Sequence, residues 1–367
     1  MPDPPSGHPL HTRSLTIVIR ADGDGSWRVR GDVIDLRKCG FVPMPQSLQP
    51  AGIIHHMTLE AQIEPEERRL ESLRTEQPHV AIEPSAWSEG QCCRDPAPRL
   101  QALVGERFDA GFAKRLSISF GGPLGCSHLL TLFQLVASAI PRAADLERGQ
   151  GIARKRAAGE WIFRRSCFVD GLEHADESIE LALQLHDFHS QSSEHFAHPV
   201  DRLDRHDEIR VSARIQTPGM TLRSLAARER HRTPDTMATA DWRYHTPVLE
   251  HLAGDPIVPG LAAKLFAALG KAPEHALLLE GALQLAPAHI QVLAAVTDRW
   301  LARSREPGAS IPTRKGDLAV ASLGGLPDSC YMWRSGGPLL RMRGGSSGGS
   351  SGGSSGGSSG GSSGDVG

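Results

Sequence analysis

A stretch of 35 residues recurs later in the chain, and this repeat constrains the fold more than any other feature. Residues 103–137 align with residues 252–286 without a gap, and nine of the 35 positions are identical, where average composition would give roughly two or three. A second block of matches relates residues 61–73 to residues 213–225. We therefore expect the chain to consist of two related halves.

The segments around these blocks carry the patterns of strands and helices. Alternating apolar and polar residues predict strands, and longer apolar stretches bounded by glycine or proline predict helices. The first half has expected strands at 14–20, 27–36 and 57–63 and helices at 104–116 and 127–140, the last ended by Pro141; the second half repeats this order with strands at 179–188 and 209–215 and helices at 261–269 and 275–301. The predicted fold class is α+β, with two pseudo-repeated strand-then-helix units packed as a duplicated fold.

These patterns divide the chain into six parts. They are a disordered N-terminus (1–13), a first α+β unit carrying a Cys/His site (14–141), a linker (142–160), a second, degenerate unit (161–303), a C-terminal extension (304–343) and a disordered Gly/Ser tail (344–367). The tail contains five GGSS units, which form flexible coil. Whether the tail is natural or engineered is left open.

Composition narrows the choice of partners and compartment. With a net charge of −2, the chain gives no reason to expect nucleic acid or a membrane as partner. Six cysteines in 367 residues do not form a disulfide framework, so we expect a reduced, cytoplasmic protein. Asp35 and Lys38 are assigned to surface ion pairs, with binding of an anionic substrate as the alternative. Arg164 and Arg165 are assigned to a solvated face or a domain boundary. We expect a small-molecule substrate, and a homo-oligomer is compatible with the sequence.

The reactive residues of the first block are absent from its copy. Cys126 and His128 follow three glycines at the start of an expected helix, whereas their aligned positions hold His275 and Leu277. The positive end of a helix dipole lowers the pKa of a thiol placed there, and His128 can stabilise the thiolate. The sequence thus predicts one chemical site on a repeated scaffold.

Further cysteine and histidine residues favour a metal. Cys92 and Cys93 lie in a proline-rich loop, and His55 begins an expected strand. Thiolates and imidazoles drawn from separate loops are typical of a zinc site, with iron as an alternative. The expected ligands are His55, one of Cys92 and Cys93, Cys126 and His128. The same residues also fit a metal-free site in which Cys126 is a nucleophile with His128 or His55 as its base.

The first 140 residues resemble a family of uncharacterised bacterial proteins. The resemblance rests on these segments: Arg20-Ala21-Asp22-Gly23, Asp35-Leu36-Arg37-Lys38, His55-His56-Met57, Cys92-Cys93, Leu103-Val104-Gly105 and Gly121-Gly122-Pro123-Leu124-Gly125-Cys126-Ser127-His128-Leu129. The family has His-Asp-Met where this chain has His55-His56-Met57, and Thr where it has Ser127. The candidate catalytic residues are Cys126, His128 and His56; if the family's Asp at position 56 is a general base, its replacement by His56 speaks against catalysis in this chain.

Two functions from different classes fit these expectations. The first is a metal-dependent hydrolase or lyase acting on a small carbonyl, acyl or aromatic compound. The second is a non-catalytic metal-binding protein, similar to iron–sulfur scaffolds, whose Cys/His set holds a structural metal or a cluster. A metal whose coordination positions are all filled by the protein would favour the non-catalytic metal-binding protein. An open coordination position would favour the enzyme.

Overall fold

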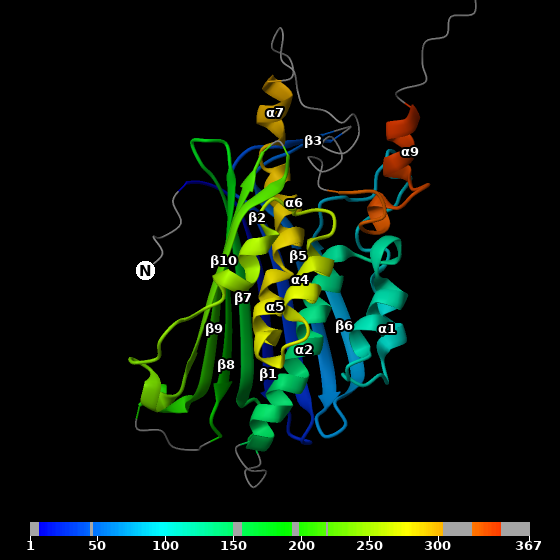
Figure 1. Cartoon of the computed structure of the whole chain (residues 1–367). Helices are drawn as coiled ribbons and strands as arrows, with labels where there is room; N and C mark the ends of the chain where they lie inside the picture. Colours follow the sequence, from blue (N-terminus) through cyan, green and yellow to red (C-terminus); the bar gives the residue numbers. More distant parts are fainter. Residues whose placement is uncertain are drawn as a thin grey trace, which may run out of the picture.

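A single nine-stranded antiparallel sheet dominates the computed structural model, which describes residues 7–44, 47–149, 156–192, 198–217, 219–303 and 325–345. Helices cover one of its faces (Figure 1). The strand order is β11-β10-β9-β8-β7-β1-β2-β5-β6. The strands are β1 (His8–Ala21), β2 (Trp27–Arg37), β5 (Gly52–Glu64), β6 (Arg69–His79), β7 (Trp161–Glu173), β8 (Ile179–Ser190), β9 (Leu203–Gln216), β10 (Thr221–Arg232) and β11 (Arg243–Tyr244), with β3 (Val42–Met44) and β4 (Ser47–Gln49) as a separate pair.

Alternation explains why these segments are strands. On β5, Met57, Leu59, Ala61 and Ile63 are buried, while Glu60 between them is exposed, as period-2 patterning predicts. A turn at residues 22–25 connects β1 to β2, and β5 ends at Glu64, directly before Pro65. The strand predictions are confirmed in these segments.

The predicted fold class is wrong. Instead of two strand-then-helix units packed together, the strands of both sequence halves form one continuous sheet. The halves are joined where β1 pairs with β7, from His8↔Glu173 to Arg20↔Trp161. This pairing joins residues more than 140 positions apart, and local patterning carries no information about such a contact.

Helices of different lengths cover one face of the sheet (Figure 1). The α-helices are α1 (Phe112–Phe120), α2 (Ser127–Gly149), α3 (Thr246–Leu249), α4 (Leu261–Leu269), α5 (Ala276–Ala282), α6 (Leu285–Ala294), α7 (Thr297–Arg303) and α9 (Pro338–Gly345), with short 3₁₀ turns that include η1 (Ala97–Leu103), η2 (Gly122–Leu124) and η7 (Tyr331–Trp333). Helix α2 packs on β1, β2, β5 and β7, and α6 packs on β1, β2, β7 and β8. The cavity described below lies between these two helices.

Helix boundaries differ from the predictions at three places. The expected helix 275–301 is divided into α5, α6 and α7. The segment 104–116 is not one helix, because the chain turns at Gly105, whose φ is +93°, before α1 begins at Phe112. Pro141 lies inside α2 rather than ending it. Proline removes one backbone hydrogen bond, but Ile140, Ala143 and Ala144 beside it are buried on the sheet, which offsets that loss.

The predicted termini and linker are also corrected. Strand β1 begins at His8, so residues 8–13 are ordered, since they pair with β2 and β7. Helix α2 occupies the start of the predicted linker 142–160. In the described part of the extension 304–343, η7 packs on η2, and Met332, Trp333 and Leu339 form a small apolar cluster with Ile82. Residues 304–324 and nearly all of the predicted tail lie outside the described residues.

Two helical segments, Ser127–Gly149 and Pro273–Ala294, are long and apolar enough to cross a membrane by length and hydropathy alone. More than half of the apolar window of each is buried inside the protein. Their apolar character is therefore accounted for by packing on the sheet.

Candidate functional site

A carboxylate on the covered face of the sheet forms the centre of the site. Asp35 on β2 lies directly opposite Arg13 on β1 and His55 on β5. All three side chains are buried, and Asp35 has no exposed surface. The sheet register thus places a cation, a carboxylate and an imidazole side by side beneath the helices.

Each oxygen of Asp35 has its own set of partners. His11 Nε2 lies 3.1 Å from Oδ1. His128 Nε2 lies 3.2 Å from Oδ2, and His55 Nδ1 lies 3.6 Å from the same atom. Arg13 Nη1 lies 3.4 Å from Oδ1 and 3.3 Å from Oδ2. Oδ2 therefore faces the imidazoles of His55 and His128, while His11 is hydrogen-bonded to Oδ1.

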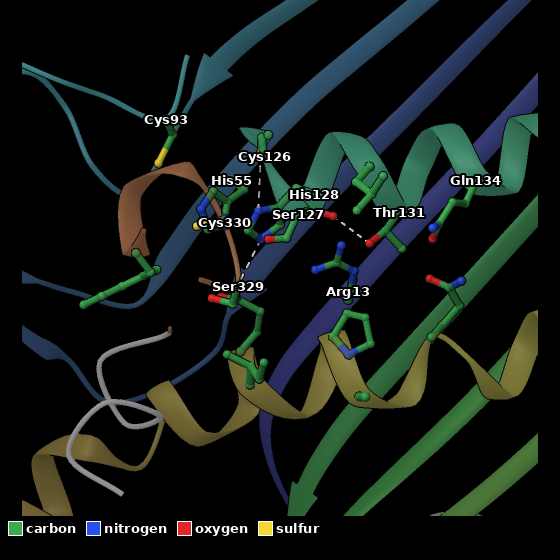
Figure 2. Close-up of a pocket in the computed structure, with 18 of the residues that line it drawn as sticks. Arg13, His55, Cys93, Cys126, Ser127, His128, Thr131, Gln134, Ser329 and Cys330 are labelled. Atoms are coloured by element: carbon green, nitrogen blue, oxygen red, sulfur yellow. Dashed lines mark hydrogen bonds between the residues drawn. The ribbon is translucent and has the colours of Figure 1, made fainter. Parts of the chain in front are cut away.

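The glycine-rich turn before α2 brings His128 to this centre. A side chain at Gly125 would meet the Phe120 ring at 2.7 Å, so only glycine allows the chain to pass this close to the end of α1. Cys126 directly precedes α2 and His128 lies in its first turn, and the rings of His128 and His55 lie 3.8 Å apart between centroids. Figure 2 shows Cys126, His128 and His55 grouped at one end of the cavity.

Of Asp35, His55 and His128, only Asp35 is charged at neutral pH. Burial raises the pKa of Asp35, but Arg13 and the hydrogen bonds from His11 and His128 hold it well below its ordinary value. Burial lowers the pKa of His55 well below its usual range. Burial also lowers the pKa of His128, although the carboxylate of Asp35 acts in the opposite direction. At neutral pH the site thus holds an ionised carboxylate and two neutral imidazoles.

These protonation states and distances suit a divalent metal. The ligand atoms of Asp35, His55 and His128 all lie within 4.8 Å of one another. Two donors about 2.1 Å from a tetrahedral metal lie about 3.4 Å apart, close to the 3.2 and 3.6 Å measured from Oδ2 of Asp35. Within the described residues, Nδ1 of His55 is buried without a hydrogen-bond partner, as a free ligand atom would be.

Cys126 is near this group but is not a thiolate. Its Sγ lies 3.8 Å from Nδ1 of His128 and 3.6 Å from Sδ of Met57. Burial raises the pKa of the Cys126 thiol to about 12. The expectation of a lowered pKa is therefore wrong, because desolvation of the charged form outweighs the helix dipole and nearby backbone N–H groups.

The other predicted site residues are placed differently. Cys93 lines the cavity, and burial, with Cys126 and Cys330 nearby, raises its pKa well above the ordinary value. The Cys92 thiol instead donates to Asp95 at 3.1 Å. His56 points to the opposite face of the sheet, where its Nε2 lies 3.8 Å from Asp32. The structure thus brings His55, Cys93, Cys126 and His128 to one cavity and separates Cys92 and His56 from it.

Sequence reasoning missed three residues of the centre. Asp35 was assigned to the surface, and His11 and Arg13 to a disordered terminus, yet each is at least 98% buried. The signal that could have found them is alternation: Val29, Val33 and Asp35 share one face of β2, so the carboxylate continues an apolar row.

A cavity of about 560 Å³ adjoins the centre, and it is lined mainly by apolar atoms. The sheet, α2 and α6 supply its walls, and residues 329–333, far along the chain, close one end (Figure 2). Arg13, Arg37, His55 and His128 contribute polar groups. Its size falls in the usual range for small-molecule sites.

In a comparison with known protein families, one family model matches part of the chain. The model of a family described as "Protein of unknown function (DUF2889)" matches residues 11–141. This supports the resemblance of the first 140 residues to an uncharacterised family, and the matched region contains Arg13, Asp35, His55 and His128. No curated protein matches the chain, and no solved structure matches it.

Proposed function

We propose that the protein is a metal-dependent enzyme, a hydrolase or lyase acting on a small organic carbonyl, acyl or aromatic compound. The meeting of Asp35, His55 and His128 beside a large, mostly apolar cavity carries the proposal. The ion is zinc or iron, because both accept imidazole nitrogen and carboxylate oxygen. In this ligand set Asp35 replaces the cysteines that the sequence suggested.

Three protein ligands leave a coordination position for water or substrate. A metal held there lowers the pKa of a bound water to about 7 or polarises a carbonyl oxygen. Donation from His11 to Oδ1 of Asp35 fixes the carboxylate, as outer hydrogen bonds do for metal ligands. The apolar walls exclude water from the reacting centre.

One arrangement favours a second candidate, a thiol enzyme without metal. Cys126 Sγ, the two ring nitrogens of His128 and Oδ2 of Asp35 follow one another at 3.8 and 3.2 Å. This is the order of nucleophile, base and orienting acid. The raised pKa of Cys126 makes the metal enzyme the better proposal, since the thiol would start fully protonated.

Elemental analysis of adjacent histidine variants tests the metal proposal. His55 and His56 follow each other on β5 but point to opposite faces. We expect about one zinc or iron per chain in the unmodified protein and in His56→Gln, and at least a tenfold loss in His55→Gln and His128→Gln. Circular dichroism checks that each variant is folded. Equal metal content in all folded variants, or none in the unmodified protein, contradicts the proposal.

A cobalt-substituted sample separates an enzyme from a non-catalytic metal holder. Azide added to the cobalt protein enters an open coordination position and changes the visible absorption spectrum. We expect such a change. A spectrum unaffected by azide would indicate full coordination and favour the structural or scaffold alternative.

A further inference from the structure

Arg13 is a buried cation whose donors are largely unused. The side chain is 1% exposed, and Nη1 reaches Asp35 at 3.3 and 3.4 Å. Among the residues that the structure describes, none accepts a hydrogen bond from Nε or Nη2 of Arg13. Leaving such donors buried without an acceptor is costly, and more so for a charged group. Arg13 lines the cavity.

Arg165 is an arginine in the same kind of position elsewhere in the sheet, and its donor groups all have acceptors. Arg165 on β7 lies directly opposite Asp187 on β8, as Arg13 lies opposite Asp35. Nε and Nη2 of Arg165 each reach a carboxylate oxygen of Asp187 at 2.7 Å. Its Nη1 donates to Ser138 at 2.6 Å and to Glu280 at 2.5 Å. Every nitrogen of Arg165 therefore has an acceptor within the chain.

The unused donors of Arg13 form one edge of its guanidinium. Nε–H and one Nη2–H are parallel, and this edge binds carboxylates through two hydrogen bonds, as Arg165 does with Asp187. In Figure 2 the guanidinium of Arg13 lies between α2 and the yellow helix α6, in the region of the cavity. The partner of this edge would therefore come from a molecule in the cavity.

The other charges around the cavity are offset within the chain. Arg37 is a second buried arginine in its wall, bonded to Gln49 through Nη1 at 2.9 Å and Nη2 at 3.1 Å. Burial lowers the pKa of Arg37 to about 10, so it stays charged at neutral pH. Asp35 offsets one of the two arginines, and Glu280, also in the wall, is paired with Arg165. Asp298, beyond the wall, also acts on Arg37 and offsets its charge, so the free donors of Arg13, rather than a net charge, favour an anion.

We propose that the cavity takes an organic monocarboxylate, whose carboxylate binds Nε and Nη2 of Arg13 and whose apolar body lies along the walls of α2 and α6. The apolar lining of the cavity includes Leu130, Leu135, Ile290 and Phe266. This inference names the substrate class of the proposed enzyme and rests on that proposal only in assigning the cavity as its substrate site.

Calorimetric titration with matched acids and amides tests the inference. Butanoate, hexanoate and 4-phenylbutanoate are each compared with the corresponding primary amide, which has the same shape and no charge. We expect the unmodified full chain to bind at least one acid tenfold or more tightly than its amide. Arg13→Lys keeps the charge but loses the paired donors, and we expect the preference to fall below threefold. Arg28→Lys, at an exposed pair with Asp22, is the control and retains it.

The unmodified protein decides the question even if Arg13→Lys fails to fold. No preference for the acid in any pair, including no binding of either compound, overturns the inference, as does an unchanged preference in folded Arg13→Lys. Metal content is measured on the same samples. Metal without acid preference overturns the inference alone, whereas acid preference without metal overturns the proposed function alone.

Discussion

Arg165 and Arg13 occupy equivalent places opposite an aspartate on the neighbouring strand, but only Arg165 has every nitrogen hydrogen-bonded within the chain. Arg165 is fully buried, and it connects β7 and β8 with α2 and α5 through Ser138 and Glu280. Arg165 is thus structural, and Arg13 has donors available to a ligand.

Arg165→Met is expected to destabilise the protein strongly. Removing one partner of a buried ion pair typically costs about 3–5 kcal/mol; here Glu280 loses the cation it pairs with, and Asp187 keeps only Arg142, at 2.9 Å. Urea unfolding measures the loss. Arg28→Met, at a pair in which the arginine side chain is 71% exposed, should cost no more than about 1 kcal/mol. Similar losses in the two variants would contradict this account of the buried network.

Gly171→Ala is expected to disturb the packing of α6 on β7. An added Cβ would lie 2.8 Å from Cγ1 of Val292 and still closer to its Cγ2. Overpacking of this kind usually costs about 1–3 kcal/mol. Gly23→Ala is the control, because its Cβ would meet only Ala158 at an ordinary 3.7 Å. Thermal unfolding midpoints that fall equally in both variants would argue against close helix–sheet contact at Gly171.

His289 is expected to make the protein sensitive to acid. Burial lowers the pKa of His289 to about 3 from 6.5, so the unfolded chain binds a proton that the folded state does not. Its contribution to stability is complete above pH 6.5 and is lost as pH falls towards 3. Between pH 7 and pH 5 this loss is about 2 kcal/mol.

His289→Leu removes that titration. The decrease in the free energy of unfolding between pH 7 and pH 5, measured in urea, should be about 2 kcal/mol smaller in His289→Leu than in the unmodified protein. His231 does not confuse the comparison, because the carboxylates of Asp207 and Glu229 raise its pKa to about 9. Its stabilising effect is fully present below pH 6.5 and begins to be lost above it, and this change is the same in both proteins. An identical pH dependence in both proteins would refute the prediction.

Cys126 is expected to resist alkylation at neutral pH. The thiolate is the reactive form, and burial raises the pKa of Cys126 to about 12. Mass spectrometry after iodoacetamide treatment at pH 7.5 should find Cys126 unmodified in the folded protein and modified in urea. Rapid labelling of the folded protein would instead support the thiol enzyme.

Local sequence patterns predicted where strands lie, but not that the strands of both halves join into one sheet. Alternation predicted strands at 14–20, 27–36 and 57–63, and each of these segments lies within a strand of the structure. The joining of β1 to β7 depends on residues far apart in sequence, and no local period encodes it. For the same reason the repeat was interpreted as two packed units.

The candidate site was predicted in part. Cys126, His128 and His55 were singled out by residue type, and the structure places them together. Asp35 and Arg13 were not, because a charged residue is usually solvated and only its position in an apolar row shows otherwise. Residues 329–333 and α6 complete the cavity from outside the matched region 11–141, so that region alone could not show its shape.

X-ray absorption spectroscopy at the edge of the bound metal tests the central claim, the ligand set of Asp35, His55 and His128, most directly. The account predicts nitrogen and oxygen neighbours at about 2.0–2.2 Å, with the multiple-scattering pattern of imidazole and no sulfur at about 2.3 Å. A sulfur neighbour would place Cys126 or Cys93 in the ligand set and contradict it.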